Sequence, residues 1–146
     1  MQRTAADIAS YVFYSTDFAD GAQTLTVEYS GAVLQGSIVV YTCTGVWTSN
    51  PFRGAATTSN FSNNGLSVSI DVPSASGDLL FDAVAVGSLN AGLSPTIGAG
   101  QTSLYNLNVG TDNLDQSGST EPGVGGNVTM SWSTVSTEAW ASVGGR

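Results

Sequence analysis

The sequence predicts an all-β protein, a two-sheet antiparallel β-sandwich with jelly-roll or Greek-key topology and eight or nine strands. Thr, Val, Tyr and Phe recur in short alternating runs, and clusters of Gly, Asn, Ser and Pro separate these runs. No stretch carries a convincing amphipathic helical pattern. With 146 residues, of which 41% are hydrophobic, the chain suits one hydrophobic core, so residues 1–146 are expected to form a single domain.

Three strands are expected before residue 50. Residues 8–15 are rich in apolar and aromatic side chains. Leu25, Val27 and Tyr29 alternate with polar residues, which directs one face of that segment inward and the other into water. Residues 38–46 are more uniformly apolar, as in a strand that is covered on both faces. The lone Cys43 in this segment is expected to act as a small hydrophobic residue, with no disulfide partner in the chain.

A β-hairpin is expected around Asn63-Asn64-Gly65, between strands at 57–61 and 66–72. The Asn-Gly pair supplies the positive φ angles of a type I′ turn. Further strands are expected at 78–86, 104–109, 127–134 and 138–143, the last two as an antiparallel pair. Residues 88–100 and 110–126 are expected to be loops. The predicted core consists of Val68, Ile70, Leu79, Phe81, Val128, Met130 and Trp132.

The charge composition excludes several classes of function. The chain has 3 Lys+Arg, no His, 11 Asp+Glu and a formal net charge of -8. A nucleic-acid-binding protein needs a basic surface, as does a protein that binds an anionic membrane, and three scattered arginines cannot form one. Without histidine, Ser-His-Asp and Cys-His catalysis and His-ligated metal sites are excluded.

The segment that follows Met1 does not resemble a targeting signal. Arg3 provides a positive charge, but no apolar run of about 7–15 residues follows it, so no signal peptide is expected. No run approaches the roughly 18 apolar residues that would span a bilayer. We therefore expect a protein that stays in the cytosol, is released by lysis, or is cut from a longer exported polypeptide.

The second half of the chain contains the segments SGDLLFDAVAV (76–86), GAGQT (98–102), GSTEPG (118–123) and VTMSWS…EAWASV (128–143). Over about 76–143 it resembles a β-sandwich module family found in bacterial secreted and surface proteins and in phage fibre or virion proteins. The resemblance implies a structural or adhesive β-sandwich. It carries no established enzyme chemistry.

Acidic residues suggest two sites, each with a simpler explanation. Asp112, Asp115 and Glu121 form a weak calcium candidate, since hard oxygen ligands on one loop suit Ca²⁺, but a solvated acidic loop explains them as well. Glu28, Glu121 and Glu138 are the candidates for paired-carboxylate glycoside hydrolysis. No spacing shows that two of these glutamates converge, and Glu28 and Glu138 are expected to point outward. No cofactor is therefore expected, apart from this calcium candidate.

Aromatic residues supply the candidates for a partner or glycan contact. Trp47, Phe52 and Arg53 follow a predicted core strand and could stack on a sugar or anchor a protein partner, or they could cap the open end of the sandwich. Trp140 points away from the small residues of its strand, and is either core or an interface residue.

These observations favour a non-enzymatic structural protein of a multi-copy assembly. A phage virion component, such as a capsid decoration, cement or fibre protein, fits best, with this protein itself or a capsid or fibre protein as partner. Residues 1–10 and 110–126 are the segments expected to reach a neighbour. The alternative is a carbohydrate-binding or adhesive module of a bacterial extracellular or cell-surface protein. The expected location is accordingly a virion or the cell exterior.

Overall fold

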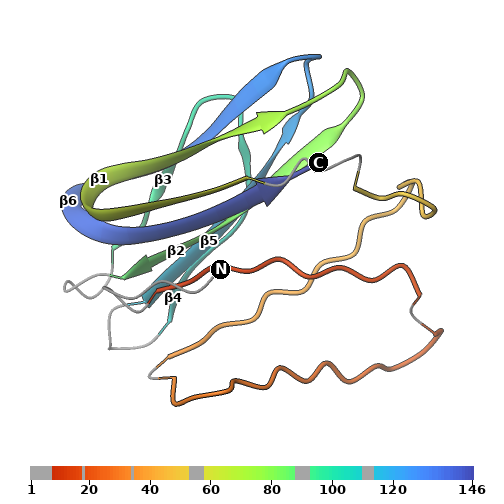
Figure 1. The fold of residues 1–146 in the computed structure, drawn as a ribbon, viewed down its shortest axis with the longest axis horizontal. Helices are drawn as coiled ribbons and strands as arrows, with labels where there is room; N and C mark the ends of the chain where they lie inside the picture. Colours follow the sequence, from red (N-terminus) through yellow and green to blue (C-terminus); the bar gives the residue numbers. More distant parts are fainter. Residues whose placement is uncertain (1–7, 18, 34, 53–57, 88–92, 110–113) are drawn as a thin grey trace.

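The computed structural model describes residues 8–17, 19–33, 35–52, 58–87, 93–109 and 114–146. Within these ranges the chain forms one antiparallel sheet, which does not close (Figure 1). Its strands are β1 (Thr58–Pro73), β2 (Leu79–Gly87), β3 (Thr96–Ile97), β4 (Thr102–Val109), β5 (Leu114–Pro122) and β6 (Asn127–Gly145). Their order is β1-β6-β2-β5-β4, and β3 pairs with β6 outside this path.

The all-β antiparallel prediction is confirmed, but the strand count is not. Six strands in a single sheet form within the described residues, where eight or nine strands in two sheets were expected. The residues that were expected to form two strands at 127–134 and 138–143 belong to one continuous strand, β6. In Figure 1, β1 and β6 curl together at one end of the molecule. This curl folds the sheet over, so that β1 and the first part of β6 can pack against β2.

The Asn-Gly signal produces a bulge, which is why the predicted hairpin is absent. β1 continues through Asn63, Asn64 and Gly65, and its pairing with β6 changes register on either side of Gly65. Asn64 has a φ of 64°, in the left-handed region that Asn tolerates better than most residues. A bulge bends its strand and increases the local twist. The left-handed residue therefore helps β1 to bend where the sequence suggested a chain reversal.

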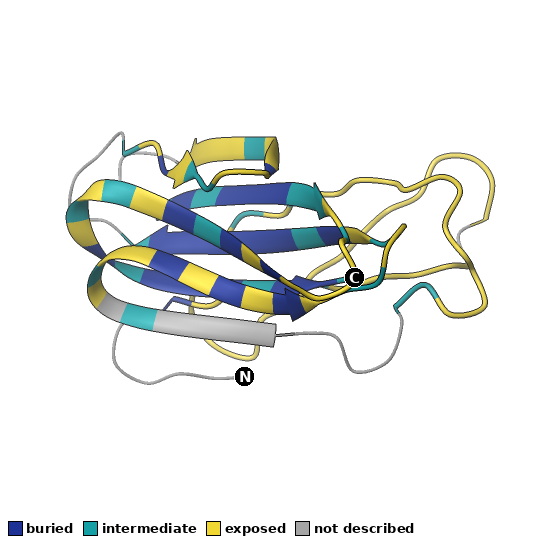
Figure 2. Cartoon of the chain, turned by 90° about the horizontal axis from the view of Figure 1, so that it is seen from above, coloured by how far each residue is buried: buried dark blue, intermediate teal, exposed yellow. Residues whose placement is uncertain are grey.

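The hydrophobic core lies between β1 and the first part of β6 on one side and β2 on the other. Val68, Ile70 and Val72 on β1 face across to Trp132, Met130 and Val128 on β6, in register. These six residues are buried, and they cluster with Leu80, Val84, Val86 and Trp140. Figure 2 shows the alternation of buried and exposed residues along the strands. The core prediction is confirmed for Val68, Ile70, Val128, Met130 and Trp132.

The predicted facing of β2 is wrong by one residue. Leu80 is fully buried, whereas Leu79 is 54% exposed and Phe81 lies on the opposite, half-buried face. Residues 79–86 are apolar on both faces apart from Asp82, so their alternation does not show which face points inward. Asp82 points inward and is 1% exposed. A charged residue on the buried face obscures the apolar–polar alternation from which the facing would be predicted.

β5 was expected to be part of a long loop at 110–126. It is instead an interior strand between β2 and β4, and its inward residues Asp115, Ser117 and Ser119 are all fully buried. A strand whose inward side chains are polar carries no hydrophobic alternation, which explains the error. The short β3 also lies inside a predicted loop, at 88–100.

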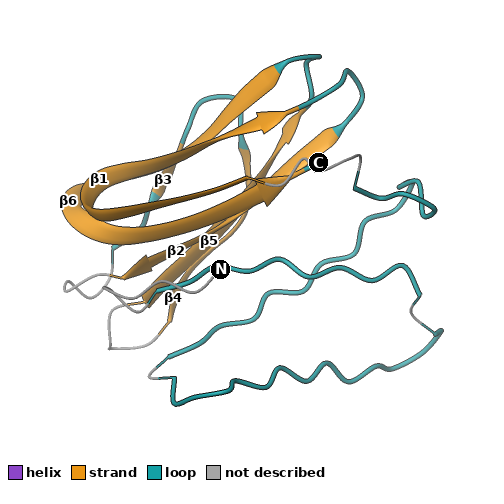
Figure 3. Ribbon diagram, viewed as in Figure 1, coloured by secondary structure: helices purple, strands orange, loops and turns teal. Residues whose placement is uncertain are grey.

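The described residues between 8 and 52, which we call the N-terminal arm, contain no strand. In Figures 1 and 3 the arm makes three drawn-out passes beside the sheet, at about 8–17, 22–31 and 35–47. The strands expected at 8–15, around 25–29 and at 38–46 fall on these passes. They run extended, as the sequence suggested, but they are not paired into a sheet. Cys43 is free and exposed here and lies outside any strand, so the prediction of a small hydrophobic residue within a strand is wrong.

Candidate functional site

The arm contacts the outer face of the sheet, which we define as the side of β2, β5 and β6 that points away from the core. Ile8 is 8% exposed and clusters with Ala85 of β2 and Ala141 of β6. The Ser10 hydroxyl donates a hydrogen bond to the Ala83 carbonyl at 3.0 Å. Small side chains on the outer face let the arm approach closely, and these contacts hold its first pass against β2.

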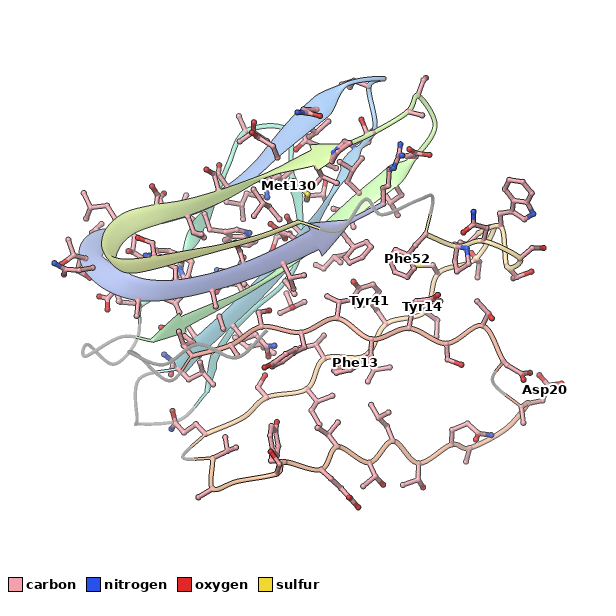
Figure 4. All side chains as sticks on the ribbon, in the orientation of Figure 1. Phe13, Tyr14, Asp20, Tyr41, Phe52 and Met130 are labelled. Carbon is pink, nitrogen blue, oxygen red and sulfur yellow. The ribbon has the colours of Figure 1, made fainter. Side chains whose placement is uncertain are left out.

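The end of the arm is held on the same face by aromatic contacts. The ring of Phe52 lies 4.4 Å from that of Tyr14 and 5.4 Å from that of Phe81, centroid to centroid, the second contact being edge-to-face. Figure 4 shows Tyr14 and Phe52 next to each other. Such aromatic pairs contribute about 0.5–1.5 kcal/mol beyond the area they bury. Phe52, expected to contact a partner or to cap the sandwich, packs within its own chain.

Most of the arm's large apolar side chains are exposed to solvent. Of the eighteen large hydrophobic residues that are exposed within the described ranges, twelve lie in the arm. Phe13, labelled in Figure 4, is 83% exposed, and Trp47 is 65% exposed. The other ten are Tyr11, Tyr14, Leu25, Val27, Tyr29, Val33, Ile38, Val40, Tyr41 and Val46. Monomeric proteins rarely expose large apolar surfaces, and such surfaces mark interaction sites.

The arm carries very little charge. Between residues 8 and 52 the sequence has only Asp17, Asp20 and Glu28 as charged residues. Glu28 is exposed, as expected from the sequence. A surface of this composition attracts partners mainly through apolar burial and backbone hydrogen bonds, because it offers few ion pairs.

The remaining aromatic candidates separate into two environments. Trp47 begins a turn in which the Asn50 amide donates to the Trp47 carbonyl at 3.2 Å, and its indole is exposed. Trp140 is completely buried, and its indole N–H donates to the Gly65 carbonyl at 2.7 Å. Trp140 is therefore a core residue, which leaves no surface for it to offer a partner. Arg53 lies outside the described residues.

The calcium candidates do not come together. Asp115 and Glu121 stand six residues apart at opposite ends of β5, a span of about 20 Å along a strand. Asp112 falls outside the described residues. Where the structure is described, no group of three or more Cys, Asp or Glu side chains could hold a metal ion. The acidic loop that was also expected to reach a neighbour is, from Leu114 onward, part of the sheet interior.

A buried polar network, which the sequence analysis missed, lies beside the hydrophobic core. The Asp82 carboxylate accepts hydrogen bonds from the Ser119 amide and hydroxyl at 2.7 and 2.8 Å and from the Trp132 indole N–H at 2.7 Å. Gln101 donates to the Ser119 hydroxyl at 2.6 Å and accepts from the Ser131 amide at 2.8 Å. Burial raises the pKa of Asp82, and the hydrogen bonds from Ser119 and Trp132 oppose this rise. The network ties β2, β5 and β6 to the segment before β4.

A second buried carboxylate is less well satisfied. Asp115 is fully buried, and its Oδ1 accepts a hydrogen bond from the Asn108 amide at 2.7 Å, while its Oδ2 has no partner. Burial raises the pKa of Asp115, and the charge of Glu138 raises it further. Glu138 is itself only 4% exposed, so its predicted outward orientation is wrong. The register change between Gly65 and Ser67 lies opposite residues 134–137 and alters the alternation that leads into Glu138.

These carboxylates are poorly placed for catalysis. Asp82, Asp115 and Glu138 are each no more than 4% exposed, so a substrate could not reach them without opening the sheet. Glu121 lies against Gly100, where an added Cβ would touch its carboxylate. The arrangement can stabilise the fold, whereas the exposed arm can contact another molecule.

No protein-family model matches the chain, and neither a curated protein nor a solved structure matches it. No helix among the described residues is long and apolar enough to cross a membrane.

Proposed function

We propose that this protein is a non-enzymatic structural component of a multi-copy assembly and that its N-terminal arm is the contact surface. The observation that carries the proposal is the row of exposed apolar side chains along the arm, twelve of the eighteen exposed large hydrophobic residues in the described ranges. Burying these side chains against a neighbour would stabilise the assembly by about 25 cal/mol per Å² of apolar surface removed from water.

The arm has the features of strands that have not yet been paired. Its passes are extended, and the alternation of Leu25, Val27 and Tyr29 with polar residues is that of a half-buried strand. An extended segment without a sheet exposes its backbone N–H and C=O groups, which can pair with another strand. In the assembly, the arm forms the second hydrogen-bonded layer over the outer face. The finished fold is then the two-sheet sandwich expected from the sequence.

The kind of assembly is inferred from the sequence. The resemblance of 76–143 to modules of phage fibre and virion proteins and of bacterial surface proteins favours a phage virion component, such as a capsid decoration, cement or fibre protein. The absence of lysine removes one common protection of strand edges against pairing. The partner of the arm in this proposal is a second copy of this chain, within an assembly that can also contain a capsid or fibre protein, and the location is the virion.

One observation favours a second candidate function, that of a carbohydrate-binding or adhesive module. Trp47 presents its indole to water on a turn that a backbone hydrogen bond from Asn50 closes, and an exposed flat ring can stack on a sugar. Binding on a glycan array that is lost in Trp47→Ala, while the solution mass stays unchanged, would favour this candidate over assembly through the arm.

The proposal is tested by the solution mass of three proteins, measured by light scattering after size-exclusion chromatography. The wild type should have a mass that is a multiple of 14.9 kDa. Phe13→Ser, at an arm residue that is 83% exposed, should shift the mass toward the monomer at the same concentration. The matched control is Val135→Ser, at a residue of β6 that is 93% exposed, and it should leave the mass unchanged. A monomeric wild type, or equal masses for both variants and the wild type, would overturn the proposal.

A further inference from the structure

The middle pass of the arm, residues 22–31, is the most open part of the described chain. Every described residue from 19 to 33 is exposed, and in Figure 1 this pass lies farthest from the sheet. Leu25 is 58% exposed, Val27 38% and Tyr29 53%. The hydroxyl of Tyr29 lies over Gly36, where an added Cβ would come within 2.8 Å of it. Tyr29 is therefore held along the arm, away from the core.

We infer that residues 23–31 pair in antiparallel fashion with the same residues of a second copy, about a two-fold axis at Val27. This inference rests on the proposed function, and it names the partner and the register of one contact. A contact of this kind is isologous, because the same surface serves both copies, and it closes as a dimer. The two strands would join as an added strand joins a sheet edge, through backbone hydrogen bonds.

The side chains select this register over its neighbours. With the axis at Val27, the two Val27 residues lie opposite each other. Leu25 of each copy lies opposite Tyr29 of the other, so three cross-strand pairs are apolar or aromatic. Glu28 then faces Thr26, and its charge is not opposed by another charge. An axis that fell between two residues would place every apolar side chain opposite the polar face of the partner.

The two adjacent registers are worse for identifiable reasons. An axis at Glu28 would put the two Glu28 carboxylates directly opposite each other, and like charges at such positions are destabilising. An axis at Thr26 would put Tyr29 opposite Gln23, which leaves only the Leu25–Val27 pairs. The register centred on Val27 is the one that satisfies both the apolar residues and the charge.

A second copy suits this segment better than a charged partner. Residues 21–33 contain Glu28 as their single charged residue and have neither lysine nor proline, the residues that most often prevent strand pairing at an edge. A basic partner could form an ion pair with only one carboxylate of this segment. An identical strand offers a matching row of apolar side chains, and it places no like charges opposite each other.

The test is disulfide trapping in a Cys43→Ser background, which removes the exposed native thiol. In the inferred register the Cβ atoms of the two Val27 residues lie about 4.5–5.5 Å apart, close to the separation that a disulfide needs. Val27→Cys should therefore form a covalent dimer under mild oxidation. The matched control is Leu25→Cys, whose two copies lie about four residue steps apart, or roughly 13 Å, and should remain uncrosslinked. The double variant Leu25→Cys with Tyr29→Cys should regain the dimer, since these positions face each other.

The outcomes separate this inference from the proposed function. Dimer formation by Val27→Cys and by the double variant, but not by Leu25→Cys, supports the register. Equal crosslinking of Val27→Cys and Leu25→Cys, or none in Val27→Cys while the wild type remains a multimer, overturns the register and leaves the proposed function standing. A wild type that is monomeric at 14.9 kDa at all concentrations overturns both.

Discussion

Replacing Asp115 with Asn should stabilise the protein at neutral pH, although the residue is fully buried. The Asn108 amide donates to Oδ1 at 2.7 Å, and an Asn side chain keeps an oxygen there to accept this bond. The unpartnered Oδ2 would become an uncharged amide nitrogen. The substitution thus removes a buried charge together with its repulsion by the charge of Glu138.

The size of the effect follows from the buried charge. A buried polar atom without a hydrogen bond costs about 1–3 kcal/mol, and more when it is charged, so the Asn amide keeps the first cost and removes the excess due to the charge. We therefore expect Asp115→Asn to raise the free energy of unfolding by about 1 kcal/mol at pH 7. At roughly 2–4 °C per kcal/mol for a chain of about this length, the melting temperature should rise by about 2–4 °C.

The pH dependence supplies a second measurement. Burial and Glu138 raise the pKa of Asp115 above its ordinary value of 3.8, so the folded protein holds the proton more tightly than the unfolded chain. Its contribution to stability is therefore complete below pH 3.8 and is lost as the pH rises through the raised pKa. Asn cannot ionise, so the difference between the wild type and Asp115→Asn should be large at pH 7 and should shrink on acidification.

The matched control is Asp82→Asn, at a buried carboxylate whose oxygens are all hydrogen-bonded. Here the new amide would face the Trp132 indole N–H or the Ser119 donors, two donors would oppose each other, and stability at pH 7 should fall by about 1–3 kcal/mol. Thermal melts of the wild type and both variants between pH 4 and pH 7 test the comparison. The reasoning would be refuted by a loss of stability in Asp115→Asn at pH 7, or by a gain that does not change with pH.

Three further predictions test the core and the absence of a structural metal. Ile70→Ala, at a residue 4% exposed, should cost about 2–5 kcal/mol in chemical denaturation through lost burial and the cavity left behind, and a loss below about 0.5 kcal/mol would contradict its inward facing. Leu80→Ala should lower the free energy of unfolding by about 2–5 kcal/mol, because Leu80 is fully buried. Leu79→Ala, at a residue that is 54% exposed, should lower it by less than about 1 kcal/mol. A larger loss in Leu79→Ala than in Leu80→Ala would contradict the facing of β2. EDTA should leave the melting temperature unchanged, because Asp115 and Glu121 lie at opposite ends of β5 and cannot share a metal ion. An appreciable decrease in the melting temperature would indicate that these residues do bind calcium.

The parts of the fold that the sequence predicts are those in which one face of a strand is apolar and the other polar. Val68, Ile70 and Val72 alternate with polar residues, as do Val128, Met130 and Trp132, and both sets point inward as expected. Leu79 and Leu80 are adjacent and equally apolar. Their facing depends on the partners of Asp82, which are distant in sequence, so alternation alone cannot determine it.

The errors arise where long-range contacts override a local signal. β5 is buried through polar residues that are hydrogen-bonded to other strands, so its sequence looks like a solvated loop. Asn64 and Gly65 favour a turn locally, but pairing with β6 on both sides keeps the chain in one strand. Of the candidate site, the sequence singles out Trp47 as either a surface contact or a cap, and the structure exposes its indole. The exposure of the whole arm does not, because its alternating pattern predicts strands whether or not a partner is present.

Hydrogen–deuterium exchange along residues 8–52, measured at two protein concentrations, tests the central claim most directly. If the arm pairs with neighbouring copies, its amides should exchange slowly at high concentration, above all at 23–31, and quickly after dilution, while β2 and β6 stay protected at both concentrations. Exchange of the arm that is fast and identical at both concentrations would contradict the account, because an arm without pairing in the concentrated sample cannot be the surface through which copies assemble.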